Sequence, residues 1–234
     1  GLSAAEPRCN LGPSPAAGIG EPVKLCVFLS SNSLRKMVFV VNVDEHANLL
    51  LKGSQKVSFS DPNYTDAVYT WVSTAQETPA YPLDCKENSD IDSRKSLASC
   101  PQVYSSTSHV AQLLNLVINM HEGEISSFAW DTGCAGCGPS RCMQSAKKLD
   151  VLRGGGFSAD TSAFFDRGAC GQEVTRCSPD DFSCDLKLFI TWAGTDRSGN
   201  HLRSAGTRLS KFTGHSLGSL YETMDDSYTS TTKR

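Results

Sequence analysis

The distribution of cysteine constrains this chain more than any other feature of its sequence. Ten of the 234 residues are cysteines, and six of them fall between Cys134 and Cys184. An even and high count is typical of a disulfide framework in an oxidising compartment. We therefore predict about five disulfides, of unknown pairing, among Cys9, Cys26, Cys85, Cys100, Cys134, Cys137, Cys142, Cys170, Cys177 and Cys184. Adjacency in the chain suggests a bond between Cys85 and Cys100.

Cysteine also serves in zinc binding and in redox catalysis, but the sequence pattern that each of these requires is incomplete here. Cys134-x-x-Cys137 supplies half of a tetrahedral zinc site, but no second CxxC and no H-x₃₋₅-H pair completes it. A thioredoxin-like redox pair lies in a βαβ setting, and Gly133, Gly136 and Pro139 oppose a helix at this point. Disulfides are therefore favoured over a zinc site and over redox catalysis.

Hydrophobicity and charge indicate whether the chain can form a core, bind nucleic acid or span a membrane. Hydrophobic residues make up 39% of the chain, which is enough for a packed core. The formal net charge of −3 argues against a nucleic-acid partner, because such proteins usually carry a basic excess. Gln112, Asn115 and Asn119 interrupt the most apolar segment, so we expect no membrane span in this chain.

Two features point to secretion. The chain begins at Gly1 and not at Met, as expected of a chain that has lost a signal peptide. Asn63-Tyr64-Thr65 is an N-glycosylation sequon, which makes Asn63 a candidate glycosylation site. We therefore expect a glycoprotein that is secreted or lies at the cell surface.

Apolar runs and alternating patterns predict strands along most of the chain. Val23–Leu29 and Met37–Val43 flank a turn-like Ser-rich segment and predict a hairpin, with the first strand inside a sheet. Leu49–Leu51 and Lys56–Phe59 suggest a second pair, and Val68–Val72 alternates. Residues 75–108 are polar and predict a long loop.

The C-terminal half carries the clearest strand. Cys184–Trp192 alternates, with Leu186, Leu188 and Ile190 on one face. A turn at residues 195–200, with Gly199 suited to a positive φ, predicts a returning strand over residues 201–212.

Residues 110–130 allow two interpretations. Val110, Leu113, Leu114 and Val117 fit one face of a helix, whereas the residues Leu114, Leu116, Ile118 and Met120 fit one face of a strand. A turn signal at Glu122-Gly123, followed by a second apolar run, favours a hairpin.

These patterns together predict an all-β, disulfide-stapled, β-sandwich-like domain with long loops and a disordered C-terminal tail. We expect an extended lead-in over residues 1–22, held by Cys9, and a β domain over residues 23–217 with its cysteine knot at 130–184. Residues 218–234 are rich in Ser, Thr, Asp and Tyr and predict a flexible tail.

Two motifs imitate catalytic sites. Gly214-x-Ser216-x-Gly218 matches a nucleophile elbow, but no buried strand precedes it and no His follows it. Asp131-Thr-Gly resembles the triplet of aspartic proteases, which need a second such carboxylate, and the chain has none. We therefore expect no catalytic residues and no enzymatic activity, with a secreted hydrolase as a less favoured alternative.

Calcium is the cofactor that the sequence leaves open. Oxygen-bearing side chains cluster in three loops, but none has the twelve-residue pattern of an EF-hand loop, and the clusters are Asp61/Asn63/Asp66, Asp90/Asp92 and Asp196/Ser198/Asn200. Turns capped by their own side chains are the favoured interpretation of each.

Two stretches carry a family resemblance. The segment Lys187–Gly206 (KLFITWAGTDRSGNHLRSAG) and the stretch Trp130–Cys137 (WDTGCAGC) resemble small secreted cysteine-rich proteins of green algae and land plants. That group has no defined function. The resemblance implies an extracellular or cell-surface setting and carries over no reaction and no site residue.

The functional prediction rests on two points. Disulfides would hold the loops rigid, and the sequence shows no complete set of catalytic residues. We expect a non-enzymatic module that binds an extracellular or cell-surface protein or assembles into an extracellular complex. The alternative is a lectin-like carbohydrate-binding module, which would present an exposed aromatic ring to a sugar. The candidates for that ring are Trp71, Trp130 and Trp192, although each lies in an apolar context that favours the core.

Overall fold

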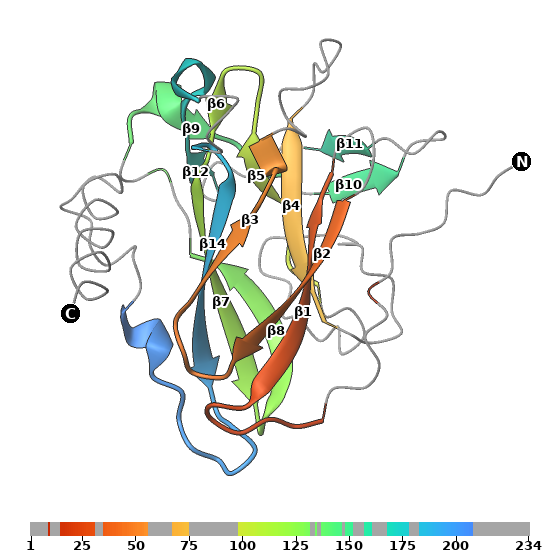
Figure 1. The fold of residues 1–234 in the computed structure, drawn as a ribbon, viewed down its shortest axis with the longest axis vertical. Helices are drawn as coiled ribbons and strands as arrows, with labels where there is room; N and C mark the ends of the chain where they lie inside the picture. Colours follow the sequence, from red (N-terminus) through yellow and green to blue (C-terminus); the bar gives the residue numbers. More distant parts are fainter. Residues whose placement is uncertain are drawn as a thin grey trace, which may run out of the picture.

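Figure 1 shows the fold of the chain in a computed structural model. It describes residues 9, 15–30, 35–55, 67–74, 98–131, 134, 137–146, 148–151, 157–160, 168–177 and 183–207. Apart from the helical residues Ser54 and Gln55, the regular structure in these residues consists of β-strands with short 3-10 helices, so the predicted all-β class is confirmed. The predicted tail, residues 218–234, lies outside the described residues, as does the candidate glycosylation site Asn63.

The larger sheet has six strands in the order β13-β6-β5-β4-β1-β2. Its pairings are antiparallel throughout. In chain order its strands are β1 (Pro22–Leu29), β2 (Arg35–Asn42), β4 (Val68–Ser73), β5 (Gln102–Ser105), β6 (His109–Val110) and β13 (Gln172–Glu173).

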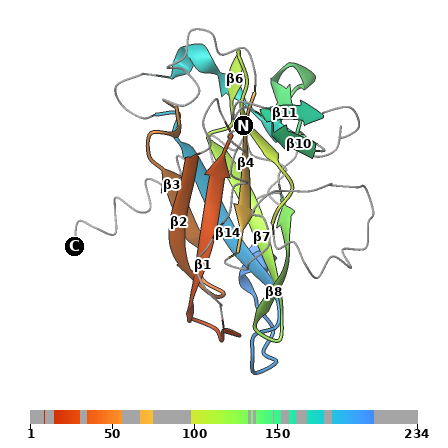
Figure 2. The same ribbon diagram turned by 90° about the vertical axis from the view of Figure 1, so that its right-hand side faces the viewer.

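The smaller main sheet has four strands in the order β3-β14-β7-β8. Its central pair, β14 and β7, runs parallel, whereas both outer pairs are antiparallel. Its strands are β3 (Ala47–Leu51), β7 (Leu113–His121), β8 (Glu124–Trp130) and β14 (Leu186–Gly194). Figures 1 and 2 show the two sheets as the two layers of a sandwich.

Two small antiparallel ladders complete the fold. One pairs β9 (Cys142–Met143) with β12 (Ala169–Cys170), and the other pairs β10 (Lys148–Val151) with β11 (Phe157–Asp160). The 3-10 helices are η2 (Pro139–Arg141), η4 (Val174–Arg176) and η5 (Ser204–Thr207).

The core forms where the apolar faces of the strands meet. The parallel register sets Leu188 beside Leu114, and farther along the same face it sets Trp192 beside Ile118. All four side chains are fully buried. Alternation in these strands therefore gives a continuous apolar face, as their sequence pattern predicts.

The hairpin interpretation of residues 110–130 is confirmed. β7 and β8 pair across a two-residue turn in which Glu122 and Gly123 have φ angles of 51° and 84°. Two consecutive residues with positive φ are the mark of a type I′ turn, whose twist suits a hairpin. The predicted hairpin of Val23–Leu29 with Met37–Val43 is also confirmed, because β1 pairs with β2 along its whole length.

Two predictions about the strands are wrong in the described residues. The segment from Gln102 to Ser105 was expected to be loop, but it forms the buried strand β5. Its polar side chains are accommodated inside the protein, where the Ser145 hydroxyl donates to the Gln102 amide oxygen at 2.9 Å. Of the expected strand over 201–212, only residues 201–207 are described, and they form a single bridge at His201 before the chain enters η5.

The predicted strand Leu49–Leu51 forms as part of β3, whereas its expected pairing with Lys56–Phe59 stays a prediction. Within the described residues β3 pairs with β14, and Lys56–Phe59 lies outside them. The turn at residues 195–200 forms as predicted, with Gly199 at a φ of 79°.

Candidate interaction surface

Four disulfides join described cysteines. They are Cys9–Cys26, Cys134–Cys142, Cys137–Cys170 and Cys177–Cys184. The first ties the N-terminal segment to β1, as expected for Cys9. Cys100 is also disulfide-bonded, but its partner is outside the described residues, as is Cys85, so the Cys85–Cys100 pairing stays a prediction.

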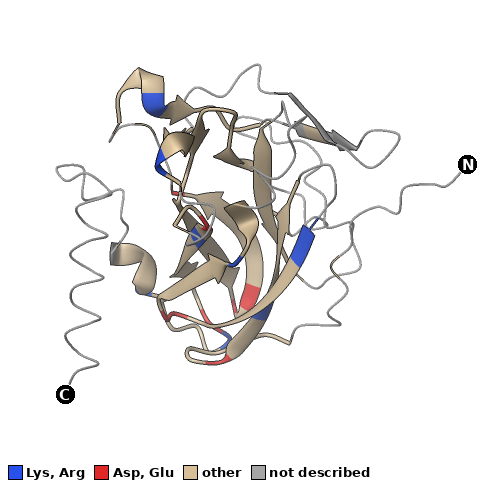
Figure 3. Ribbon diagram, turned by 45° about the horizontal axis from the view of Figure 1, so that its top comes forward, with Lys and Arg blue, Asp and Glu red and all other residues tan. Residues whose placement is uncertain are grey.

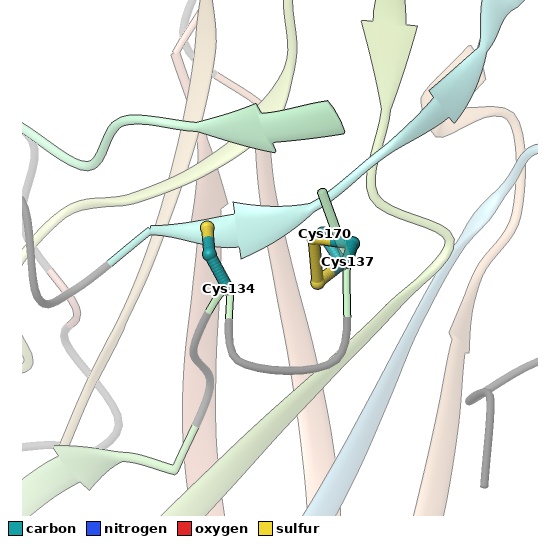
Figure 4. Close-up of side chains that lie close together, drawn as sticks. All are labelled: Cys134, Cys137 and Cys170. Carbon is teal, nitrogen blue, oxygen red and sulfur yellow. A yellow bond between two sulfur atoms is a disulfide. The ribbon is translucent and has the colours of Figure 1, made fainter. Parts of the chain in front are cut away.

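The CxxC pair is divided between two disulfides. The Sγ atoms of Cys134, Cys137 and Cys170 all lie within 4.8 Å of one another (Figure 4). Cys137 bonds to Cys170, whereas Cys134 bonds to Cys142. Each sulfur is therefore held in a disulfide, and zinc binding by these three sulfurs would first require both bonds to be reduced.

Close packing around this cluster depends on Gly168. A Cβ atom at this position would lie 2.6 Å from the Cys134 Sγ, 2.8 Å from the Cys142 Sγ and 2.7 Å from the Met143 carbonyl oxygen. Only glycine lets the backbone approach a disulfide this closely. Sequence reasoning missed this residue, although glycines on both sides of the Ala169-Cys170 pair were a usable signal.

Three loop segments form one surface beside these disulfides, which we term the stapled loop surface. β12 pairs with β9, and β13 pairs with β6, so short ladders join the segments. Further backbone hydrogen bonds run from the Val174 amide to the Ser108 carbonyl at 2.9 Å, and from the Gly171 amide to the Arg141 carbonyl at 2.8 Å. The stapled loop surface consists of residues 106–109, 138–144 and 171–177.

Two arginines are presented in the same way on the stapled loop surface. η2 ends at Arg141 and η4 ends at Arg176, and both side chains are exposed. A disulfide-bonded cysteine follows each arginine directly, and these are Cys142 and Cys177. The Arg141 Nε also donates to the Gly171 carbonyl at 3.1 Å, which orients the guanidinium.

The electrostatics of this surface are mixed. Glu173 is exposed and lies in β13, in register with the half-buried His109. Figure 3 shows that basic and acidic residues both occur along the ribbon of the described part of the chain. Such a surface suits a partner with matched charges of both signs more than a polyanion such as nucleic acid.

The tryptophans offer little for stacking on a sugar. Trp71 and Trp192 are fully buried, and Trp71 stacks on Phe28 with ring centroids 5.2 Å apart. Trp130 is half-buried, and its indole N–H donates to the Cys100 carbonyl at 2.7 Å. Trp130 is thus the only tryptophan of the three that is not fully buried.

Of the two motifs that resemble catalytic sites, the described residues include only Asp131. Asp131 is half-buried and accepts a hydrogen bond from the Asn115 side-chain amide at 3.2 Å. Gly214, Ser216 and Gly218 lie outside the described residues. The structure therefore leaves the nucleophile-elbow motif untested.

Asp196 forms the kind of capped turn that the sequence suggested. One carboxylate oxygen accepts from the Ser198 amide at 2.9 Å and from the Asn200 amide at 2.8 Å, and the other accepts from the Asn200 side chain at 3.1 Å. Burial raises the pKa of Asp196, but hydrogen bonds from Asn200, Ser198 and Ile19 outweigh it, so the pKa lies below its usual value. The Asp196 carboxylate therefore accepts hydrogen bonds from its own loop and from Ile19 in the N-terminal segment.

The other candidate calcium clusters lie outside the described residues, and they are Asp61/Asn63/Asp66 and Asp90/Asp92. A calcium site therefore stays a prediction. No helix in the described part of the chain is long and apolar enough to cross a membrane.

Comparison with family profiles places the chain in a family. The profile of the family described as Uncharacterised protein DDB_G0273449 matches residues 24–224. The chain belongs to this family. No curated protein and no solved structure matches the chain. The resemblance to cysteine-rich proteins of green algae and land plants stays a prediction.

Proposed function

We propose that this protein is a non-enzymatic extracellular module that binds another extracellular or cell-surface protein through its stapled loop surface. The observation that carries the proposal is the paired presentation of Arg141 and Arg176. Each is an exposed side chain whose backbone is fixed by a neighbouring disulfide. Rigid presentation lowers the entropy cost of binding, and arginine is a frequent hot-spot residue.

The disulfides support the extracellular setting. Four bonds between described cysteines, together with the bonded Cys100, are typical of an oxidising compartment. We expect the partner to present carboxylates to the two arginines and a cation to Glu173. Carbohydrate binding is less supported because Trp71 and Trp192 are buried in the core.

A cell-surface binding assay tests this function. Fluorescent, tetramerised protein is titrated onto cells of the source organism, with and without prior treatment of the cells by protease or glycosidase. We expect saturable binding that protease abolishes and glycosidase spares. Binding that is lost only with glycosidase would support the lectin-like alternative, and no saturable binding would contradict the proposed function.

Paired arginine variants locate the surface. We expect the double variant Arg141→Ser/Arg176→Ser to bind at least about tenfold more weakly, since a hot-spot arginine contributes about 2 kcal/mol. The matched control is Lys52→Ser/Arg203→Ser, which also removes two exposed cations but lies outside the stapled loop surface. Equal loss in both double variants would mean that net charge, and not this surface, governs binding.

A further inference from the structure

Strand β2 leaves one edge of the larger sheet open. β2 is the last strand in the order β13-β6-β5-β4-β1-β2, and it pairs with β1 over eight consecutive residue pairs without a bulge. On its other side no strand pairs with it in the part of the chain that the structure describes. An open edge is a template for another strand.

The direction of the backbone groups shows which residues offer hydrogen bonds. The Val43 amide, just beyond β2, donates to the Glu21 carbonyl at 3.0 Å. Hydrogen-bonded pairs alternate along an antiparallel ladder, so Val41, Phe39 and Met37 also point their backbone groups at β1. The N–H and C=O groups of the residues between them point to the open edge, and these residues are Lys36, Val38 and Val40.

The side chains of β2 do not protect this edge. Val38 and Val40 are 47% and 59% exposed, which are the largest exposures of large apolar side chains on the described strands. Met37 and Phe39, on the other face, are only half-buried. The strand has no proline and no glycine, and its charged residues stand at one end only. Natural proteins usually guard long apolar edges with charges, bulges or prolines.

Charge along β2 favours a second copy of this chain as the occupant. The strand begins with the exposed cations Arg35 and Lys36, and it runs into a turn that carries Asp44 and the exposed Glu45. Antiparallel pairing of two copies places the basic start of each strand near the acidic turn of the other. Parallel pairing would set like charges side by side, which is destabilising.

We propose that the protein self-associates through antiparallel pairing of β2 with β2 of a second copy, which joins the two six-stranded sheets. Outward-pointing residues must face each other, so Val38 of one copy lies opposite Val38 or Val40 of the other. Pairing covers the outer valines and also the half-buried Met37 and Phe39. This association is independent of the stapled loop surface, which belongs to other strands.

The mass of the purified full chain tests the proposal. Sedimentation equilibrium and light scattering over about 1 µM to 1 mM protein should show a reversible monomer–dimer equilibrium, because one strand pair forms a small interface of modest affinity. Val38→Lys should weaken dimerisation at least tenfold. The control Leu50→Lys changes a residue that is 40% exposed on β3 and should leave the mass unchanged.

Two further variants separate edge pairing from general stickiness. Val40→Pro removes an outward-pointing N–H while leaving the hydrogen bonds from Val41 and Phe39 to β1, so the monomer should stay folded. Lys36→Glu should weaken the dimer, and the same chain with Glu45→Lys added should regain it. If Val40→Pro fails to fold, Val38→Lys still decides the question.

Three results would overturn the proposal. These are a monomer at every concentration, a dimer that Val38→Lys leaves intact, and a dimer that Leu50→Lys weakens as strongly. A monomer would mean that some other segment covers β2, and it would leave the proposed binding to cell-surface proteins standing, since that is measured on cells with Arg141 and Arg176 variants.

Discussion

Individual polar side chains in the core fall into two groups. Some organise the structure, as Asp185 does by accepting hydrogen bonds from the Gly53 amide at 2.7 Å and from the Gln55 amide at 2.9 Å. Others are buried and have no hydrogen-bond partner among the residues that the structure describes, including the hydroxyls of Thr70 and Thr191. An unpaired buried hydroxyl costs free energy, so the second group lowers the stability of the fold.

This contrast gives a prediction at the residue scale. Thr191→Val keeps the shape of a fully buried side chain and removes its unpaired hydroxyl. We expect the free energy of unfolding to rise by about 1 kcal/mol, measured by urea denaturation. The control is Ser54→Ala, which removes a hydroxyl that accepts from the Leu186 amide at 2.7 Å and should cost about 1–3 kcal/mol. A loss of stability in Thr191→Val would mean that a bound water satisfies the hydroxyl.

Among elements, the parallel pair β7 and β14 depends on a glycine at its end. Gly194 has a φ of 98°, and a Cβ atom there would collide with the Met120 carbonyl on the neighbouring strand. Gly199 also has a positive φ, of 79°, but a Cβ atom there would meet open space. Alanine substitutions at these two glycines therefore distinguish the cost of backbone strain alone from the added cost of a clash between strands.

We predict that Gly194→Ala destabilises the protein by about 3–5 kcal/mol, since strain and overpacking add. Gly199→Ala should cost only about 1 kcal/mol, which is the cost of positive φ alone. Thermal unfolding followed by circular dichroism compares the two variants. Equal losses would show that β7 and β14 can separate at this end without breaking the sheet.

The same elements show what the sequence could predict. Strands with strong apolar patterns, such as β1, β7 and β14, were predicted because burial imposes a period of two. β5 was not, because its polar residues are buried through hydrogen bonds, such as that from the Tyr104 hydroxyl to the Cys184 carbonyl at 2.7 Å. The pairing of β3 and β7 with β14 joins segments far apart in the chain, and local patterns carry no information on it.

At the scale of the whole molecule, the number of cysteines predicted disulfides but not which cysteines they join. Spacing alone cannot choose among the pairings of ten cysteines. The adjacent Cys134 and Cys137 reach different partners because loop segments that are distant in sequence meet on the stapled loop surface. The candidate interaction surface was therefore out of reach of sequence reasoning, although the residues that build it lie in the stretch that the cysteines marked.

These two disulfides differ in the loops that they close, which yields a last prediction. Cys137–Cys170 spans 33 residues and Cys134–Cys142 spans 8. In the chain-entropy description the longer loop contributes about 4 kcal/mol and the shorter about 2.5 kcal/mol. Cys137→Ala/Cys170→Ala should therefore lose more stability in urea denaturation than Cys134→Ala/Cys142→Ala.

The reverse order would identify a different source of stability. Gly168 packs its backbone against the Cys134 and Cys142 sulfurs, so losing that bond also leaves a cavity beside a closely packed segment. If Cys134→Ala/Cys142→Ala loses more stability than the other variant, then packing around the disulfide contributes more to stability than the closing of the loop. Both variants should also weaken the proposed cell-surface binding. Arg141 directly precedes Cys142, and its carbonyl accepts a hydrogen bond from the amide of Gly171, the residue after Cys170.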